Sequence, residues 1–89
     1  MRIDFDPAKS AKNARERGLP FELVGDLEWD TAIVVEDARR DYGERRIRAF
    51  LYGQGKPHVV VYTMRGALRW IISFRRARET ERRLYEHKA

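Results

Sequence analysis

Three strand-like segments follow one another closely between residues 45 and 74 of this chain. RRIRAFLYG (45–53) and ALRWIISF (67–74) alternate between apolar and charged side chains, and HVVVYTM (58–64) between them is almost wholly apolar. Only the short sequences QGKP and RG separate the three. Strands joined by such short loops run antiparallel, because a parallel pair needs a crossover of about a dozen residues. We therefore predict an antiparallel meander with a buried middle strand.

The residues before and after the meander predict helices. Asp6 and Pro7 have the pattern of a helix N-cap followed by the first helical residue, and Gly18 suits the left-handed residue that ends such a helix. Apolar side chains at helical spacing predict a second, short helix within LPFELVGDLEW, residues 19–29. A third, strongly charged helix is expected from about residue 77 to residue 88.

Two further strands complete the expected fold. TAIVVE (31–36) is rich in β-branched residues, and RID (2–4) is a candidate for a short N-terminal strand. The elements then follow the order β-α-α-β-β-β-β-α within one domain, residues 1–89. We expect an α+β fold, in which an antiparallel four-stranded sheet, with or without the N-terminal strand, carries two N-terminal helices and one C-terminal helix.

The last strand of the meander should present two different surfaces, because side chains alternate between the faces of a sheet. Trp70 and the apolar residues in phase with it are expected to face the core. Arg69, Ser73 and Arg75 are expected together on the other face. Helices packed on one face of a sheet leave the second face open. We therefore predict that these three polar residues line an open surface.

Basic residues are concentrated at the C-terminal end of the chain, whose net charge is +5. Residues 1–64 contain eleven Lys or Arg and eleven Asp or Glu, whereas residues 65–89 contain eight and three, so the whole excess lies in the second range. Such a local field attracts polyanions, among them nucleic acids. The alternative is a solvated, arginine-rich helix without a ligand.

The sequence also excludes several kinds of site. It contains no cysteine, and therefore no disulfide, thiolate metal site or cysteine nucleophile. Neither histidine has a partner at metal-ligand spacing, and His58 is expected to be exposed. No glycine-rich phosphate-binding motif is present, so we expect no metal and no cofactor. No run of about 20 apolar residues and no apolar signal segment occurs, so a cytoplasmic location is expected.

A phosphodiester of RNA is a substrate that fits these residues. Its own 2′-oxygen can attack the phosphorus without a metal, provided that the developing charge is stabilised and that protons move off the 2′-oxygen and onto the 5′-oxygen. Arginine grips phosphate oxygens at two points but stays protonated, so it cannot be the base. The proton-transfer group remains open among six residues: Asp4, Asp6, Lys9, His58, Glu81 and Tyr85.

Three of these candidates also have structural explanations. Asp6 fits the N-cap of the first helix. Glu81 fits a helix-surface carboxylate that pairs with an arginine one turn away, such as Arg78. Tyr85 fits packing on the edge of the sheet as well as it fits the site.

Four segments, in order along the chain, carry a family resemblance. They are FDPAKSAKNARERGLPF at 5–21, DARRDYGERR at 37–46, VVVYTMRG at 59–66 and IISFRRARETERRLYE at 71–86. Together they resemble the BrnT toxins of bacterial type II toxin–antitoxin systems, which are similar to the RelE-type ribonucleases. The resemblance implies a RelE-like fold and a metal-independent endoribonuclease that inhibits translation by cutting RNA.

The resemblance guides the choice of site residues. Arg75 is the first candidate for a phosphate clamp, and Arg65 is the second, with a turn residue beside Gly66 as its alternative. Tyr85 and Lys9 are candidates for proton transfer or positioning. Further RNA contacts are expected from Tyr42, Arg46, Arg69, Ser73 and Arg76.

Two positions depart from the family pattern. Arg17 stands where the family has a histidine, and Trp70 stands where its members often have an arginine. These departures leave open a module that binds RNA or a protein partner without cutting, and an adaptor for an acidic helix. The resemblance also implies a partner, a small BrnA-like antitoxin with a ribbon-helix-helix DNA-binding half, which would wrap the basic surface.

Overall fold

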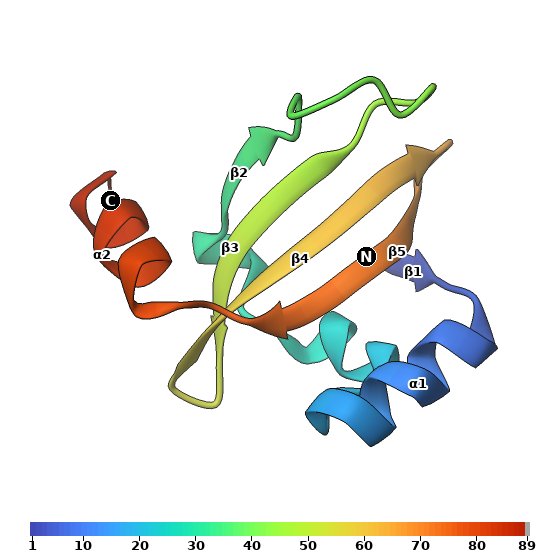
Figure 1. The fold of residues 1–89 in the computed structure, drawn as a ribbon, viewed down its shortest axis with the longest axis horizontal. Helices are drawn as coiled ribbons and strands as arrows, with labels where there is room; N and C mark the ends of the chain where they lie inside the picture. The colour runs from blue at the N-terminus through green and yellow to red at the C-terminus, as the bar shows by residue number, and fades with distance from the viewer. Residues whose placement is uncertain (89) are drawn as a thin grey trace.

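A five-stranded sheet forms the centre of the computed structural model, which describes residues 1–88 (Figure 1). The strands lie in the order β1-β5-β4-β3-β2. β1 pairs with β5 in parallel, and all other neighbours are antiparallel. The bounds are Arg2–Asp4 for β1, Ile33–Glu36 for β2, Ile47–Gly53 for β3, Lys56–Arg65 for β4 and Leu68–Arg76 for β5. The predicted meander is confirmed, and the short N-terminal strand forms the parallel edge of the sheet.

Two α-helices and two 3₁₀ segments accompany the sheet. Their bounds are Pro7–Arg17 for α1, Phe21–Asp26 for η1, Trp29–Thr31 for η2 and Glu79–Lys88 for α2. The predicted cap of α1 is confirmed, because the Asp6 carboxylate accepts the Ala8 N–H at 2.9 Å and Gly18 ends the helix at a φ of 70°. The second predicted helix is a 3₁₀ segment, and Gly25 within it disfavours an α-helix. Neither α-helix of the described chain has the length and apolar character that a membrane span requires.

The main core lies between the sheet and the segment that contains η1. Its buried residues are Leu19, Phe21, Val24, Ala49, Leu51, Val60, Tyr62, Ile71 and Phe74. Asn13 fixes α1 to the sheet, because its side-chain amide donates to the carbonyls of Leu19 at 2.6 Å and of Phe74 at 2.8 Å. Phe5 packs edge-on against Phe21, with ring centroids 5.8 Å apart. The N-terminal segment is therefore held to the sheet by one amide and two aromatic rings.

α2 packs on the opposite face of the sheet, over a second and smaller cluster. Phe50, Val59 and Tyr85 are buried there, and the rings of Phe50 and Tyr85 stack with centroids 4.8 Å apart. The expectation that all helices cover one face is therefore wrong. α2 also begins two residues later than predicted, because the Ala77 N–H donates to the Pro57 carbonyl at 2.9 Å and so prolongs the pairing of β4 with β5.

A β-bulge divides β5 into two parts. Val61 of β4 lies opposite Ser73, but the next residue, Tyr62, lies opposite Ile71. Ile72 is therefore an extra residue of β5 that has no partner in β4. A strand with such an extra residue keeps its hydrogen bonds on both sides of the bulge, but the alternation of its side chains changes phase there.

The bulge changes which side chains share a face. Trp70 lies opposite Thr63, which is two residues from the partner of Ser73, so Trp70 and Ser73 point to the same side. The prediction that Arg69 accompanies Ser73 is therefore wrong. Arg69 points to the side of the main core, where its guanidinium carbon lies 5.0 Å from the centroid of the Trp29 ring.

Candidate functional site

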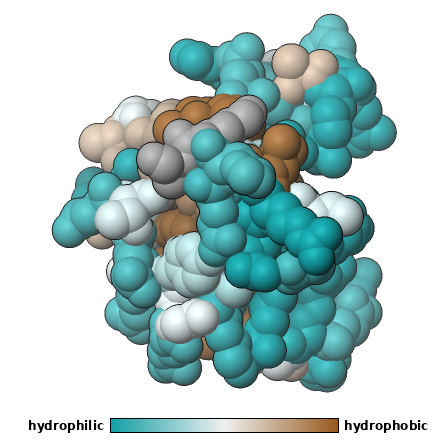
Figure 2. Space-filling model, turned by 90° about the vertical axis from the view of Figure 1, so that its left-hand side faces the viewer, coloured by the Kyte–Doolittle hydropathy of each residue, from teal (hydrophilic) through white to brown (hydrophobic). Residues whose placement is uncertain are grey.

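The face of the sheet on which α2 lies carries most of the predicted RNA contacts. α2 covers one end of this face, over Phe50 and Val59. The rest is lined by side chains from β3, β4, β5 and the loop before β3, a surface that we call the arginine face: Tyr42, Arg46, Arg48, Arg65, Trp70, Ser73 and Arg75. Figure 2 shows that the side of the molecule bearing α2 is covered mainly by hydrophilic residues. A surface of this composition suits a polyanion.

Arg75 lies at the end of β5, and Glu81 of α2 holds its guanidinium. Nη1 donates to Oε1 of Glu81 at 2.7 Å, and Nη2 donates to Oε2 at 2.8 Å, so the ion pair has two points of contact. The same carboxylate accepts the backbone N–H of Arg78 at 2.8 Å, as in a capping box at the start of a helix. The bond from Arg75 is the main reason why the pKa of Glu81 falls to about 2, and the pair raises the pKa of Arg75.

This ion pair fixes Arg75 without using all of its donors. Nη1 also donates to the carbonyl of Arg76 at 3.3 Å. Nε and the second hydrogen of Nη2 lie outside these bonds, and together they form an edge that can donate to two phosphate oxygens. Because the pKa of Glu81 is so low, its carboxylate is a poor proton acceptor near neutral pH, and its role here is to orient Arg75.

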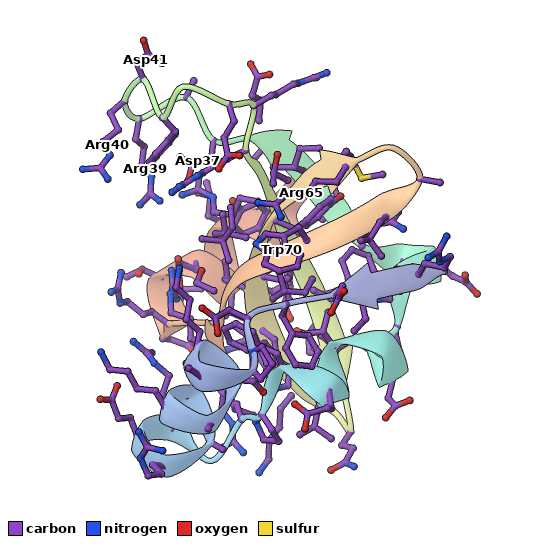
Figure 3. The ribbon with its side chains drawn as sticks, turned by 90° about the vertical axis from the view of Figure 1, so that its right-hand side faces the viewer. Asp37, Arg39, Arg40, Asp41, Arg65 and Trp70 are labelled. Carbon is purple, nitrogen blue, oxygen red and sulfur yellow. The ribbon has the colours of Figure 1, made fainter. Side chains whose placement is uncertain are left out.

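A second arginine lies near the end of β4. The guanidinium carbon of Arg65 lies 4.1 Å from the centroid of the Trp70 ring, which is a cation–π contact. Figure 3 shows the two side chains lying together over the strands. Trp70 is half-buried and faces away from the main core, so the prediction that it is a core residue is wrong. Its ring instead supports Arg65.

The loop before β3 brings a second arginine–aromatic pair to the same face. The guanidinium carbon of Arg46 lies 4.0 Å from the centroid of the Tyr42 ring. A buried carboxylate organises this loop, because Asp37 accepts bonds from Nε and Nη2 of Arg39 at 2.7 and 2.8 Å (Figure 3). The Tyr42 hydroxyl lies 3.5 Å from the same carboxylate. The hydrogen bond from Arg39 is the main cause that lowers the pKa of Asp37.

Tyr85 and Ser73 share this face but have different surroundings. Tyr85 is 4% exposed beneath α2, where it stacks on Phe50 and interacts electrostatically with Arg75. Ser73 is half-buried in β5, opposite Val61. The packing role predicted for Tyr85 is therefore confirmed, and its part in proton transfer stays a prediction.

Two of the predicted site residues point away from the arginine face. Arg69 lies over Trp29 on the side of the main core, as described above. Arg76 follows Arg75 in the strand and lines a cavity of about 220 Å³ beside the core. Lys9 is exposed on α1, and its role at the site stays a prediction.

His58 lines the same cavity and is buried, not exposed as predicted, with an exposed fraction of 5%. Its ring lies 5.4 Å from the ring of Phe74, and burial lowers the pKa of the imidazole. His58 therefore lies on the opposite side from the arginine face. Within residues 1–88, no three histidine, aspartate or glutamate side chains are grouped as a metal site would require.

The sequence reasoning missed Arg48 and the pair of Asp37 with Arg39. Arg48 lies two residues after Arg46, so the alternation of β3 already placed both on one face and was a sufficient signal. The charge of Arg48 also contributes to the low pKa of Asp37. The pair of Asp37 with Arg39 lies in a polar loop without periodicity, where no pattern predicts which charges meet.

Comparison with known protein families gives one match to this chain. A family model described as "Ribonuclease toxin, BrnT, of type II toxin-antitoxin system" matches residues 5–81. The matched range contains α1, the strands β2 to β5 and the first turn of α2, and it therefore includes the whole arginine face. No curated protein matches the chain significantly.

Proposed function

Since the chain belongs to the BrnT family of ribonuclease toxins of type II toxin–antitoxin systems, we propose that it cleaves RNA on the arginine face without a metal ion. We choose this surface because of how the guanidinium of Arg75 is held. Glu81 holds it in place while one edge of it stays outside the ion pair. The Arg46 and Arg65 pairs add two further cations on the same face. We infer a cytoplasmic site of action, because messenger RNA is the substrate of a toxin that inhibits translation.

The proposed reaction uses the 2′-oxygen of the RNA as the nucleophile. This oxygen gives up its proton as it bonds to the phosphorus, the bond from phosphorus to the 5′-oxygen breaks, and the 5′-oxygen takes up a proton. The products are a 2′,3′-cyclic phosphate and a 5′-hydroxyl. Arg75 stabilises the charge that develops on the phosphoryl oxygens, and it is already oriented before the substrate binds. Tyr85 is the proposed residue for proton transfer or positioning, because α2 places it on the same side of the sheet as Arg75. Lys9 remains the second candidate for this role.

A type II toxin has a cognate antitoxin, and we propose that this antitoxin is BrnA-like, with a ribbon-helix-helix half. Its acidic residues would cover the arginine face and so exclude RNA. Exposed ion pairs contribute only about 0–1 kcal/mol each, so apolar anchors must supply most of the affinity. Leu84 of α2 is a suitable anchor on the toxin, because it is a large apolar side chain that is 56% exposed.

An RNA digestion assay with the purified protein tests the proposed activity. The RNA is incubated with the protein in the presence of EDTA, and the ends of the fragments are analysed. We expect cleavage that EDTA does not reduce, with cyclic phosphate at the 3′ ends. Loss of cleavage in EDTA that added Mg²⁺ restores would refute metal independence. RNA binding without any cleavage, with or without Mg²⁺, would instead favour the binding module.

A further inference from the structure

Phosphate binding alone does not explain why Arg65 is paired with Trp70. A cation needs no aromatic support to attract phosphate, yet the guanidinium carbon lies over the indole ring, 4.1 Å from its centroid. Arg65 is exposed and Trp70 is half-buried, so the guanidinium lies on the solvent side of the ring. The pair therefore offers a positively charged group that is backed by an aromatic ring.

The other tryptophan of the chain, Trp29, shows what a structural indole looks like in this fold. It is half-buried and packs against the main core, where its Nε1 donates to the carbonyl of Val24 at 2.9 Å and its ring meets Tyr62 edge-on at 5.7 Å. Trp70 makes no such hydrogen bond to the part of the chain that the structure describes, and it belongs to neither buried cluster. An indole in the core would be expected to satisfy its N–H. Trp70 is thus placed as a surface residue.

The β-bulge places this pair on the same face as the proposed cleavage site. Trp70 shares the face with Ser73 and Arg75 only because Ile72 is the extra residue between them. Trp70 and Arg75 lie opposite Thr63 and Val59, which are four residues apart in β4, or about 13 Å at the usual rise. An extended single strand of RNA covers such a distance in a few nucleotides.

We propose that the outer face of Arg65, supported by Trp70, stacks an unpaired nucleobase that flanks the scissile phosphate. This inference rests on the proposed function, and it narrows the substrate to single-stranded RNA. Bases stack on guanidinium planes as well as on aromatic rings, and every base has a suitable face, so the contact tolerates any sequence. The bases of a duplex are already stacked on each other and cannot reach this surface.

Binding to RNA that cannot be cleaved tests the proposal separately from catalysis. The probes carry 2′-O-methyl groups, which remove the nucleophile, and are a single strand, the same strand in a duplex, and a single strand with abasic sites at the centre. For the wild type, we expect about 5- to 150-fold tighter binding of the intact single strand than of the abasic strand. Trp70→Ala and Arg65→Ala should remove most of this ratio. Arg83→Ala is the control, because Arg83 is exposed on α2, and it should weaken both single strands equally.

Intrinsic fluorescence supplies the second measurement. The chain has two tryptophans, so the signal of Trp70 is the difference between the wild type and Trp70→Phe. We expect the intact single strand to change the fluorescence of the wild type and to leave that of Trp70→Phe unchanged, since Trp29 packs against the main core on the other side of the sheet.

The outcomes separate this proposal from the proposed function. Equal affinity of the wild type for the intact and abasic strands, with no change in the Trp70 signal, would overturn the stacking surface even if the protein cleaves RNA. A base-dependent affinity that Trp70→Ala abolishes would support it even if no cleavage is observed.

Discussion

At the scale of single residues, Arg75 combines two requirements that are hard to meet together. A guanidinium that clamps a transition state must be fixed in advance, because fixing it during the reaction costs conformational entropy. It must also keep donors for the substrate. The contact with Glu81 uses one side of the guanidinium and leaves the edge formed by Nε and Nη2. Arginine is the only side chain with enough donors for both tasks.

Substitution of Arg75 should therefore cost more than the loss of one positive charge. We expect Arg75→Ala to lower the cleavage rate by about 10²–10³, the usual cost of removing a preorganised donor. Arg75→Lys keeps the charge but loses the planar fork, so its rate should fall nearly as far. The measurement is single-turnover cleavage of a short RNA at two salt concentrations.

Arg83→Ala provides the matched control for Arg75. Arg83 is 74% exposed on α2 and lies 3.3 Å from Glu79, so its loss should change the rate by well under tenfold and mainly at low salt. Similar small losses at both positions, in variants that fold normally, would show that Arg75 is part of a general basic patch and not of an active site.

At the scale of elements, the start of α2 depends on one carboxylate. Glu81 caps the helix through the Arg78 N–H and ties it to β5 through Arg75. Folding lowers the pKa of Glu81 from 4.5 to about 2, so folding favours its ionised form. The resulting stability is complete above pH 4.5 and is lost as the pH falls toward 2. It amounts to about 3 kcal/mol, by linkage.

Glu81→Gln tests this link between helix and strand. The amide can still accept the Arg78 N–H, but it cannot form the ion pair with Arg75. We expect the variant to be less stable than the wild type at pH 7, and we expect the difference to shrink as the pH falls through 4 to 2. Urea unfolding of both proteins at several pH values measures the difference in stability and its change with pH. A difference that stays constant with pH would mean that Glu81 contributes by packing and not by its charge.

The elements also show what the sequence can and cannot predict. The cap at Asp6 and the three strands of the meander follow from local signals, because turn residues and alternation act over a few neighbouring positions. The bulge at Ile72 has no such signal. It is decided by how two strands pair, and it moved Trp70 and Arg69 to the faces opposite to those predicted.

The position of α2 was unpredictable for a related reason. The helix carries two adjacent large apolar side chains, and either could have been its anchor. The structure buries Tyr85, which stacks on Phe50, and leaves Leu84 exposed. Of the predicted site, Arg75, Arg65, Ser73, Tyr85, Arg46 and Tyr42 come together on the α2 side of the sheet. Arg69 and Arg76 do not, because their faces depend on tertiary packing.

At the scale of the whole molecule, the two faces of the sheet have different tasks. The face under η1 holds the main core, whereas the other face carries α2 and the arginine face. A change on the arginine face, outside the pair of Arg75 with Glu81, can therefore alter activity without removing the contacts that hold the fold. Variants of that face can therefore report on activity in living cells as well as in solution.

Growth of bacteria provides the test at this scale. We expect expression of the chain without its antitoxin to stop growth, because the family consists of ribonuclease toxins. Co-expression of the antitoxin should restore growth, and Arg75→Ala should restore it without the antitoxin. Normal growth at good expression of the folded wild-type protein would count against an active toxin and would favour the binding module.

The bulge in β5 has an evolutionary consequence. In β5, the hydrogen-bond register decides whether Trp70 or Arg69 points to the face where RNA is proposed to bind. With regular pairing past Ile72, Arg69 would point to the substrate side and Trp70 would enter the core. Relocation of a single bulge can thus exchange an aromatic residue for a cation without a substitution at either position. Substrate preference in such a strand can evolve through changes at Val61, Tyr62 or Ile72, which need never touch the RNA.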